Sequence, residues 1–206
     1  MKIIGVTGGS GSGKSELCRC LFALGAAVLD TDQTAREVVQ PGKPALRELA
    51  QAFGEQILDS DGTLRRQVLA DLVFGEADAE QKACKQEKLN AITHKYIQES
   101  TASWLEKMRL TGQRFCVLDV PLLFESGMDR MCDLTVGVLA CVQTRAERIM
   151  KRDGLDRVRA ENRIAAQPDE AFYRSHCQML VCNEKNTSRE ELTAAARAIL
   201  NQAGRA

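Results

Sequence analysis

The chain contains 206 residues, and 44% of them are hydrophobic, which is enough for one sizeable domain with an insertion or two. Its 28 lysines and arginines are matched by 28 aspartates and glutamates, so the net charge favours neither nucleic acid nor an anionic membrane as a partner. Because no apolar stretch could span a bilayer and no signal-peptide pattern opens the sequence, we expect a cytoplasmic protein. The eight cysteines show no C-x-x-C pair or metal-ligand spacing, so we expect reduced thiols.

A glycine-rich loop follows the first predicted strand. The apolar, β-branched run at 3–6 predicts a buried strand, and leucines at helical spacing after the loop predict a helix. Between them lies Gly8-x-x-x-x-Gly13-Lys14-Ser15, which is the P-loop pattern in the strand–loop–helix context that the motif requires. The alternative is an ordinary Gly/Ser-rich turn, which has no need for these four positions.

A P-loop binds phosphate because its glycines let backbone N–H groups approach the phosphate oxygens, and the helix N-terminus adds partial positive charge. Lys14 can reach the β- and γ-phosphates, and the Ser15 hydroxyl can ligate Mg²⁺. We therefore expect the whole loop to contact a nucleoside triphosphate; its residues are Gly8, Gly9, Ser10, Gly11, Ser12, Gly13, Lys14 and Ser15.

A second apolar run, at 26–29, ends in Asp30-Thr31-Asp32. Ligands of parallel α/β sheets bind at the carboxyl ends of the strands, so we expect both carboxylates near the phosphate loop. Asp32 is our candidate for the group that orients the acceptor hydroxyl and accepts its proton. A role as N-cap of the next helix is equally compatible with its position.

Residues 34–111 have a largely helical pattern, with a break at Pro41-Gly42 and a turn at 59–62. We expect a helical insertion between the second and third strands. It either holds the acceptor substrate or only packs against the rest of the chain. His94 lies among its apolar residues, where a hydrogen-bonded structural role and a role in acid/base chemistry are both open.

The run at 115–120 predicts a third strand, which carries Asp119 near its end. An acidic residue ending an apolar strand has the Walker B form, and it holds Mg²⁺ directly or through water. The following segment carries unusually apolar residues, among them Leu122 and Phe124. They form either core or a wall of the substrate site.

Residues 134–139 predict a fourth strand, and a basic helix that ends at Asp153-Gly154 follows it. Arg148 and Arg152 are four residues apart, so they share a helix face. The charges form either a solvated face or a lid whose arginines cover the phosphates. One well-placed arginine contributes roughly 10³–10⁵ in rate in related chemistry.

Residues 179–182 predict the last strand, which ends at Asn183. Thr187-x-x-Glu190 has the pattern of a capping box and predicts the start of the final helix. Gly25 is predicted to end the first helix.

The sequence resembles the dephospho-CoA kinase family. The matching segments run in the right order over nearly the whole chain; they are GGSGSGKS, DTDQTAREVVQPGKPAL, KLNAITH, DVPLLFESG, RIMKRDG, RIAAQ and the strand to Asn183. DVPLLFE and AREVV-x-PG are far more specific than the P-loop alone.

The resemblance implies an α/β P-loop NTPase fold, with a parallel β-sheet core flanked by helices, a helical substrate-binding insertion and a lid. We expect a nucleotide-binding core of residues 1–32, 113–142 and 176–206, a CoA-binding part of 33–112 and a lid of 143–175. The implied reaction transfers the γ-phosphate of ATP, with Mg²⁺, to the ribose 3′-hydroxyl of dephospho-CoA, the last step of coenzyme A synthesis. We expect no nucleic-acid or membrane partner, and a monomer is favoured.

The resemblance also implies residue roles. The expected catalytic residues are Lys14, Asp32, Arg148 and Arg152, and the expected metal ligands are Ser15 and Asp119. Besides the P-loop, the expected nucleotide contacts are Glu16, Arg148, Arg163 and Asn183, the last near the adenine. The expected substrate contacts are Asp32, Arg66, His94, Leu122 and Phe124.

Four positions depart from the family pattern. Glu16 stands where Thr is usual, and Lys95 replaces the Pro after His94. Arg65 stands where Asp is common, and Arg145 takes a usual Gln position in the lid helix.

Two other functions fit parts of the sequence. A kinase of the same shape could act on a nucleotide or another small alcohol. A GTP-binding switch would share the P-loop, but the sequence contains no N-K-x-D motif for reading guanine.

Overall fold

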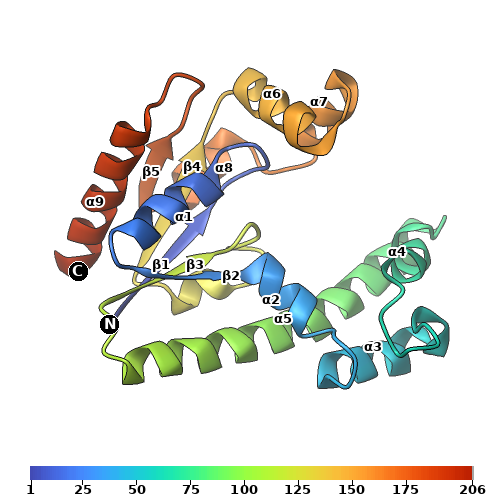
Figure 1. The fold of residues 1–206 in the computed structure, drawn as a ribbon. Helices are drawn as coiled ribbons and strands as arrows, with labels where there is room; N and C mark the ends of the chain where they lie inside the picture. The colour runs from blue at the N-terminus through green and yellow to red at the C-terminus, as the bar shows by residue number, and fades with distance from the viewer. Residues whose placement is uncertain (206) are drawn as a thin grey trace. The chain divides into compact units, whose positions relative to one another are not determined.

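The computed structural model describes residues 1–205, in which five strands form one parallel sheet (Figure 1). The strands are β1 (Lys2–Thr7), β2 (Ala27–Asp30), β3 (Phe115–Asp119), β4 (Leu134–Leu139) and β5 (Met179–Cys182). Their order in the sheet is β2-β3-β1-β4-β5, and every neighbouring pair is parallel. The predicted strands and the predicted α/β class are therefore confirmed.

The register of the sheet aligns the strand ends that precede the functional loops. Asp119 at the end of β3 is in register with Asp30 on one side and with Val6 on the other. Since the P-loop begins directly after β1, Asp119 and the P-loop leave the same edge of the sheet.

A hydrophobic cluster joins the sheet to α1 (Lys14–Ala23) and α9 (Arg189–Arg205). Leu17 and Leu21 of α1 are fully buried, as is Ile199 of α9, and they pack with Ile4 and Val136 of the sheet. Burying one such side chain contributes about 1.5–3 kcal/mol, so this cluster anchors the helix that carries the P-loop.

Two of the cysteines, Cys18 and Cys20, belong to this packing. All eight are free, as predicted, and three of them are buried. Burial raises the pKa of both Cys18 and Cys132 to about 12, so these thiols stay protonated.

The helical pattern predicted for 34–111 is confirmed. The elements are α2 (Thr31–Glu37), α3 (Pro44–Phe53), the 3-10 turn η1 (Glu55–Ile57), α4 (Arg66–Phe74) and α5 (Ala79–Leu110). The longest of them, α5, spans 32 residues. Val39, Leu49 and Ile92 are among the buried residues of a separate core in this segment.

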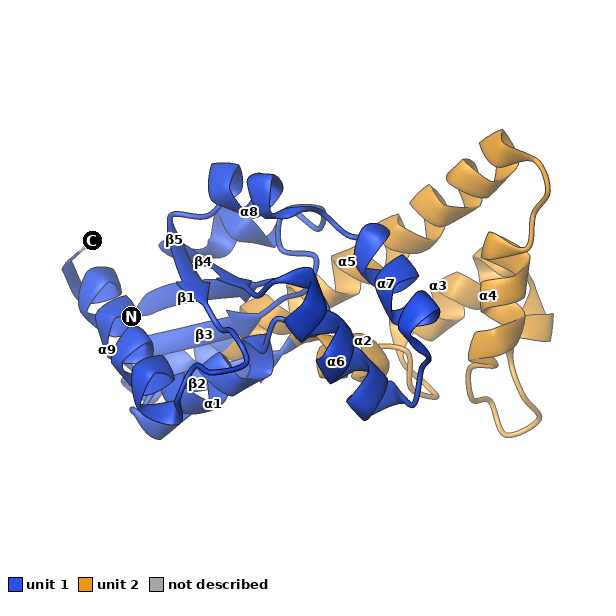
Figure 2. Cartoon of the chain, turned by 90° about the horizontal axis from the view of Figure 1, so that it is seen from above, with its two compact units in different colours: residues 1–30, 105–206 blue, residues 31–104 orange. Residues whose placement is uncertain are grey.

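The chain divides into two compact units, residues 1–30 with 105–206 and residues 31–104 (Figure 2). The first unit also contains the short turn η2 (Met128–Met131) and the helices α6 (Val142–Asp153), α7 (Arg157–Ala165) and α8 (Glu170–His176). The further division into core, CoA-binding part and lid, with the boundaries expected above, stays a prediction.

Two predicted helix ends have different outcomes. Gly25 ends α1 as predicted: its N–H bonds to the Phe22 carbonyl, and its φ of +92° is the left-handed conformation that glycine tolerates. The capping box predicted at Thr187 is wrong by one residue. The Ser188 N–H donates to the Glu191 carboxylate and the Glu191 N–H donates to the Ser188 hydroxyl, so α9 begins one position later. Thr187 instead accepts a bond from the Glu184 N–H.

Candidate nucleotide site

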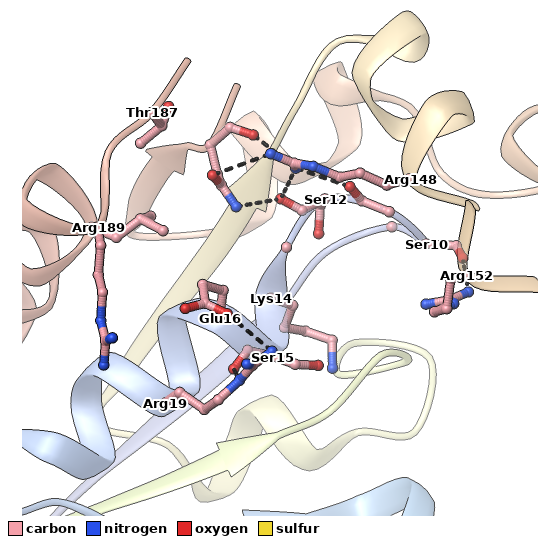
Figure 3. Close-up of a pocket in the computed structure, with 15 residues that line it drawn as sticks. Ser10, Ser12, Lys14, Ser15, Glu16, Arg19, Arg148, Arg152, Thr187 and Arg189 are labelled. Carbon is pink, nitrogen blue, oxygen red and sulfur yellow. Dashed lines mark hydrogen bonds and ion pairs between the residues drawn. The ribbon is translucent and has the colours of Figure 1, made fainter. Parts of the chain in front are cut away.

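A cavity of about 610 Å³ opens beside the P-loop (Figure 3). It is lined by Gly9, Ser10, Gly11, Ser12, Gly13, Lys14, Ser15, Glu16, Arg19, Arg148, Arg152, Asn183, Thr187, Arg189 and Leu192. Its volume lies in the ordinary range for small-molecule sites. The predicted P-loop residues from Gly9 onward therefore share one cavity with Arg148, Arg152 and Asn183.

The N-terminus of α1 faces this cavity. The Ser12 N–H bonds back to the Gly9 carbonyl, and the amides of Glu16 and Leu17 both bond to the Gly13 carbonyl. The start of a helix leaves its earlier amides for an outside acceptor, and the helix dipole favours an anion there. The Ser12 hydroxyl is buried and lacks a hydrogen-bond partner among the described residues. The loop thus offers the donors that a phosphate group accepts.

Lys14 and Asp119 form an ion pair and hydrogen bond at the carboxyl edge of the sheet. The side chains are only 13% and 7% exposed, so the pair is well shielded from water. Two residues expected to serve phosphate and metal are therefore brought together by the register of β1 and β3.

Arg148 reaches from α6 to the outer side of the P-loop (Figure 3). Its Nη1 donates to the carbonyls of Gly11 and Ser12, each at 3.1 Å, and to the Asn183 carbonyl at 2.9 Å. Its Nη2 donates to the Glu184 carbonyl at 3.1 Å. The guanidinium therefore ties the P-loop to the end of β5, and its predicted role over the phosphates stays a prediction.

Asn183, which follows β5, is 3% exposed and also connects the P-loop to the end of that strand. Its side-chain amide donates to the Ser12 carbonyl at 3.0 Å. A Cβ at Gly13 would collide with that amide nitrogen, and Gly13 has a φ of +89°. Gly13 is thus required twice, by its left-handed backbone and by the close approach of Asn183.

Two further arginines with expected roles in the predicted lid, Arg152 and Arg163, meet at one carboxylate. Asp153 at the end of α6 accepts hydrogen bonds from Arg152 and from Arg163 of α7. Hydrogen bonds from Arg152 hold the pKa of Asp153 below its usual range. Arg152 also donates to the Ser10 hydroxyl at 3.1 Å, so it reaches the P-loop as well.

Three expected substrate residues lie in the second unit. Asp32 lies in the first turn of α2, within the helix rather than before it. Arg66 begins α4, and His94 lies in α5, where burial lowers its pKa. Their roles toward a substrate stay predictions.

The remaining two expected substrate residues follow β3 in the first unit. Leu122 is 52% exposed, which is unusual for a leucine that only fills a core. Phe124 packs edge-on against Phe172, at 5.8 Å between ring centroids, and against His176 at 5.2 Å. The Phe124 ring is therefore fixed by α8, while Leu122 is available to a ligand.

Glu184 has a structural role that the sequence reasoning missed. Its carboxylate accepts bonds from the Cys141 N–H and the Thr144 hydroxyl at the start of α6. A hydrogen bond from the Cys141 side chain contributes most to holding the pKa of Glu184 below its usual range, and these two bonds act in the same direction. The only sign of this role in the sequence is the position of Glu184 directly after Asn183, close to the end of a predicted strand.

The parallel sheet, the P-loop and the buried Lys14–Asp119 pair define a P-loop nucleotide-binding protein. A profile of the dephospho-CoA kinase family matches residues 2–189. The chain therefore belongs to the dephospho-CoA kinase family, and it is a kinase, a phosphotransferase.

Individual relatives agree with this assignment. The chain is 46% identical over 171 residues to a dephospho-CoA kinase of Moorella thermoacetica, which covers 82% of this chain and 78% of that protein. It is 41% identical over 192 residues to a dephospho-CoA kinase of Corynebacterium glutamicum, and this match covers 93% of this chain and 94% of that protein. Such coverage aligns both units with these relatives.

Solved structures share the fold. TT1252 from Thermus thermophilus matches with a TM-score of 0.80 at 32% identity, over 98% of this chain and 97% of that one. Shikimate kinase from Acinetobacter baumannii matches with a TM-score of 0.54 at 15% identity, over 98% and 92%, which shows the fold alone. Within residues 1–205, no helix is both long and apolar enough to cross a membrane.

Proposed function

We propose that this chain transfers the γ-phosphate of ATP to the ribose 3′-hydroxyl of dephospho-CoA, giving CoA and ADP, as a cytoplasmic enzyme of coenzyme A synthesis. The observation that carries the proposal is family membership over residues 2–189, together with the P-loop cavity of about 610 Å³. Dephospho-CoA is the proposed substrate, without nucleic acid or membrane as partners. A monomer is sufficient for the proposal because every side chain assigned below comes from one chain.

ATP is the proposed phosphate donor. The cavity extends from the P-loop past Asn183 to Thr187 and Leu192 at the start of α9. The Lys14 end supplies positive charge and the Leu192 end supplies apolar surface, which suits a triphosphate joined to a purine. We propose Asn183 as a neighbour of the adenine, and Arg148, Arg152, Arg163 and Glu16 as residues around the phosphates.

The residues present also fit Mg²⁺. Among residues 1–205 no three His, Cys, Asp or Glu side chains gather as a metal site. Mg²⁺ is usually held by one or two protein oxygens together with phosphate oxygens and waters, which matches a Ser15 hydroxyl and an Asp119 carboxylate. When bound, the ion neutralises negative charge on the β- and γ-phosphate oxygens.

The proposed mechanism is an in-line transfer. The P-loop amides and the Lys14 ammonium hold the β- and γ-phosphates, for which Lys14 leaves Asp119. Asp32 accepts a hydrogen bond from the ribose 3′-hydroxyl and takes its proton as the oxygen bonds to phosphorus. Because the transition state is loose, Asp32 acts more by orientation than by proton removal. The arginines of the lid exclude water, which would otherwise compete as an acceptor.

The acceptor side is proposed to lie with the helical insertion and the segment after β3. Arg66 and His94 come from the insertion, and Leu122 and Phe124 from the segment after β3. The proposed parts are those expected from the sequence: a core, a CoA-binding part of 33–112 and a lid of 143–175.

A mass spectrum of the product from ATP and dephospho-CoA tests the function. We expect a mass increase of one phosphoryl group on dephospho-CoA, together with ADP. A parallel panel of nucleoside monophosphates should release no more ADP than the buffer control. ADP release with a member of that panel, and none with dephospho-CoA, would contradict the proposal. Replacing ATP by GTP tests the nucleotide assignment separately.

A further inference from the structure

The backbone N–H and C=O of Ser10 are both held by side chains from outside the P-loop. The Ser10 N–H donates to Gln167 Oε1 at 2.9 Å, and Arg145 Nε donates to the Ser10 carbonyl at 3.0 Å. Arg145 Nη2 donates to the same Gln167 oxygen at 2.6 Å. The three residues form a closed hydrogen-bonded ring that fixes the two peptide groups on either side of the Ser10 Cα.

The two side chains of this ring lie outside the lining of the large nucleotide cavity. Arg145 lines a separate small hollow of about 20 Å³ that also includes Gly9 and Tyr173. A Cβ at Gly11 would lie 2.6 Å from the Arg145 carbonyl, so the backbone of α6 also abuts the loop. Arg145 and Gln167 therefore contact the loop itself rather than the surface of the large cavity.

Arg145 is a half-buried cation whose hydrogen-bond partners are the neutral Ser10 carbonyl and the Gln167 amide oxygen. Among residues 1–205 no carboxylate lies within ion-pair distance of it. Burial lowers the pKa of its guanidinium, although the nearby Tyr173 opposes this shift. Burying part of a charge against neutral acceptors is unfavourable by itself, so these hydrogen bonds offset the cost.

We propose that Arg145 and Gln167 are positioning residues that hold the P-loop in its nucleotide-binding conformation before the nucleotide arrives. Residues 8–13 contain four glycines, so the free loop has large conformational freedom. Fixing the backbone of Ser10 removes part of that freedom in advance and lowers the entropic cost of nucleotide binding. The inference rests on the proposed nucleotide site.

Calorimetric binding of ADP, measured apart from turnover, tests the inference. Arg145→Ala and Gln167→Ala should each raise the Kd for ADP roughly tenfold, the size expected from losing a hydrogen bond to a charged group. The KM for dephospho-CoA should stay within about twofold, because neither side chain is assigned to the acceptor side. Arg157→Ala is the matched control, since Arg157 is an exposed arginine that pairs with Glu161 on its own helix. Its ADP affinity should equal that of the unmodified protein.

Gln167→Glu separates hydrogen bonding from charge. A glutamate keeps the acceptor for both the Ser10 N–H and Arg145 but neutralises the cation. Affinity for ADP within about twofold of the unmodified protein supports positioning. A loss as large as that of Gln167→Ala overturns it, because Arg145 would then act through its free charge. An unchanged Kd in both alanine variants also overturns it, whatever happens to their melting temperatures.

A double-mutant cycle supplies an independent check. A Cβ at Gly9 would collide with the Arg145 Nη2 and lie 2.7 Å from its Cζ, so Gly9→Ala displaces the guanidinium. Gly9→Ala should therefore weaken ADP binding in the unmodified protein but add little in the Arg145→Ala background. Additive effects would contradict the proposal. If the unmodified protein binds ADP normally but transfers no phosphoryl group to dephospho-CoA, only the proposed function is contradicted.

Discussion

The Lys14 ammonium and the Asp119 carboxylate form a buried ion pair although 105 positions separate them in the sequence. Lys14 begins α1 and Asp119 ends β3, and the parallel register of β1 and β3 brings these two points together. One carboxylate therefore binds the lysine and is also a candidate magnesium ligand.

Asp119→Asn should weaken both functions of this carboxylate. An asparagine lacks the negative charge that faces the Lys14 ammonium, which stays shielded from water. Breaking a buried ion pair in this way typically costs about 3–5 kcal/mol. We expect a lower free energy of unfolding by urea and a higher Mg²⁺ concentration for half-maximal turnover. Glu161→Gln, which breaks the exposed pair with Arg157, is the control and should change stability by less than about 1 kcal/mol. Equal effects of the two substitutions would refute the special role of Asp119.

Asp32→Asn should lower turnover by about 100-fold or more while ATP binding is retained, because a positioned acid/base group typically contributes 10²–10⁴. The measurement is kcat with dephospho-CoA together with the Kd for ATP. Asp30→Asn is the matched control, since Asp30 is the neighbouring carboxylate at the end of β2. Near-normal turnover of Asp32→Asn would remove Asp32 from the mechanism.

Gly13→Ala should abolish nucleotide binding, whereas Gly25→Ala should cost only stability. Both glycines have a left-handed backbone, with φ of +89° and +92°. A Cβ at Gly13 would collide with the Asn183 amide, whereas nothing lies within 4 Å of a Cβ at Gly25. We expect Gly25→Ala to lose about 1 kcal/mol from backbone strain and to bind ADP normally. Tight ADP binding by Gly13→Ala would show that Asn183 can move aside.

Glu184→Gln should make stability less dependent on pH in the acidic range. Hydrogen bonds, foremost from the Cys141 side chain, hold the pKa of the folded carboxyl below its ordinary value of 4.5, so the ionised form favours folding. This contribution is present above pH 4.5 and is lost as the pH falls through the lower folded pKa. The difference in unfolding free energy between the two proteins should thus shrink below that pH. A constant difference from pH 7 down to pH 3 would show that the charge of Glu184 plays no part.

Much of the fold followed from local patterns in the sequence. The apolar runs predicted all five strands because a strand buried on both faces needs continuous β-branched and aliphatic residues. Gly25 and Gly154 end α1 and α6 where the sequence predicted, since a left-handed residue favours glycine. The capping box failed because Thr187-x-x-Glu190 and Ser188-x-x-Glu191 have the same pattern one residue apart, and only the path of the chain selects between them.

The sequence by itself determined the phosphate-binding chemistry and the strand order along the chain, because the P-loop and its flanking elements are contiguous and depend on local backbone preferences. Only the tertiary structure decided which distant side chains support that loop. Arg148 and Asn183 hold its outer carbonyls, and Arg145 with Gln167 encloses Ser10. Such contacts depend on how α6 and β5 pack beside β1, and no spacing in the sequence encodes a distance across a sheet.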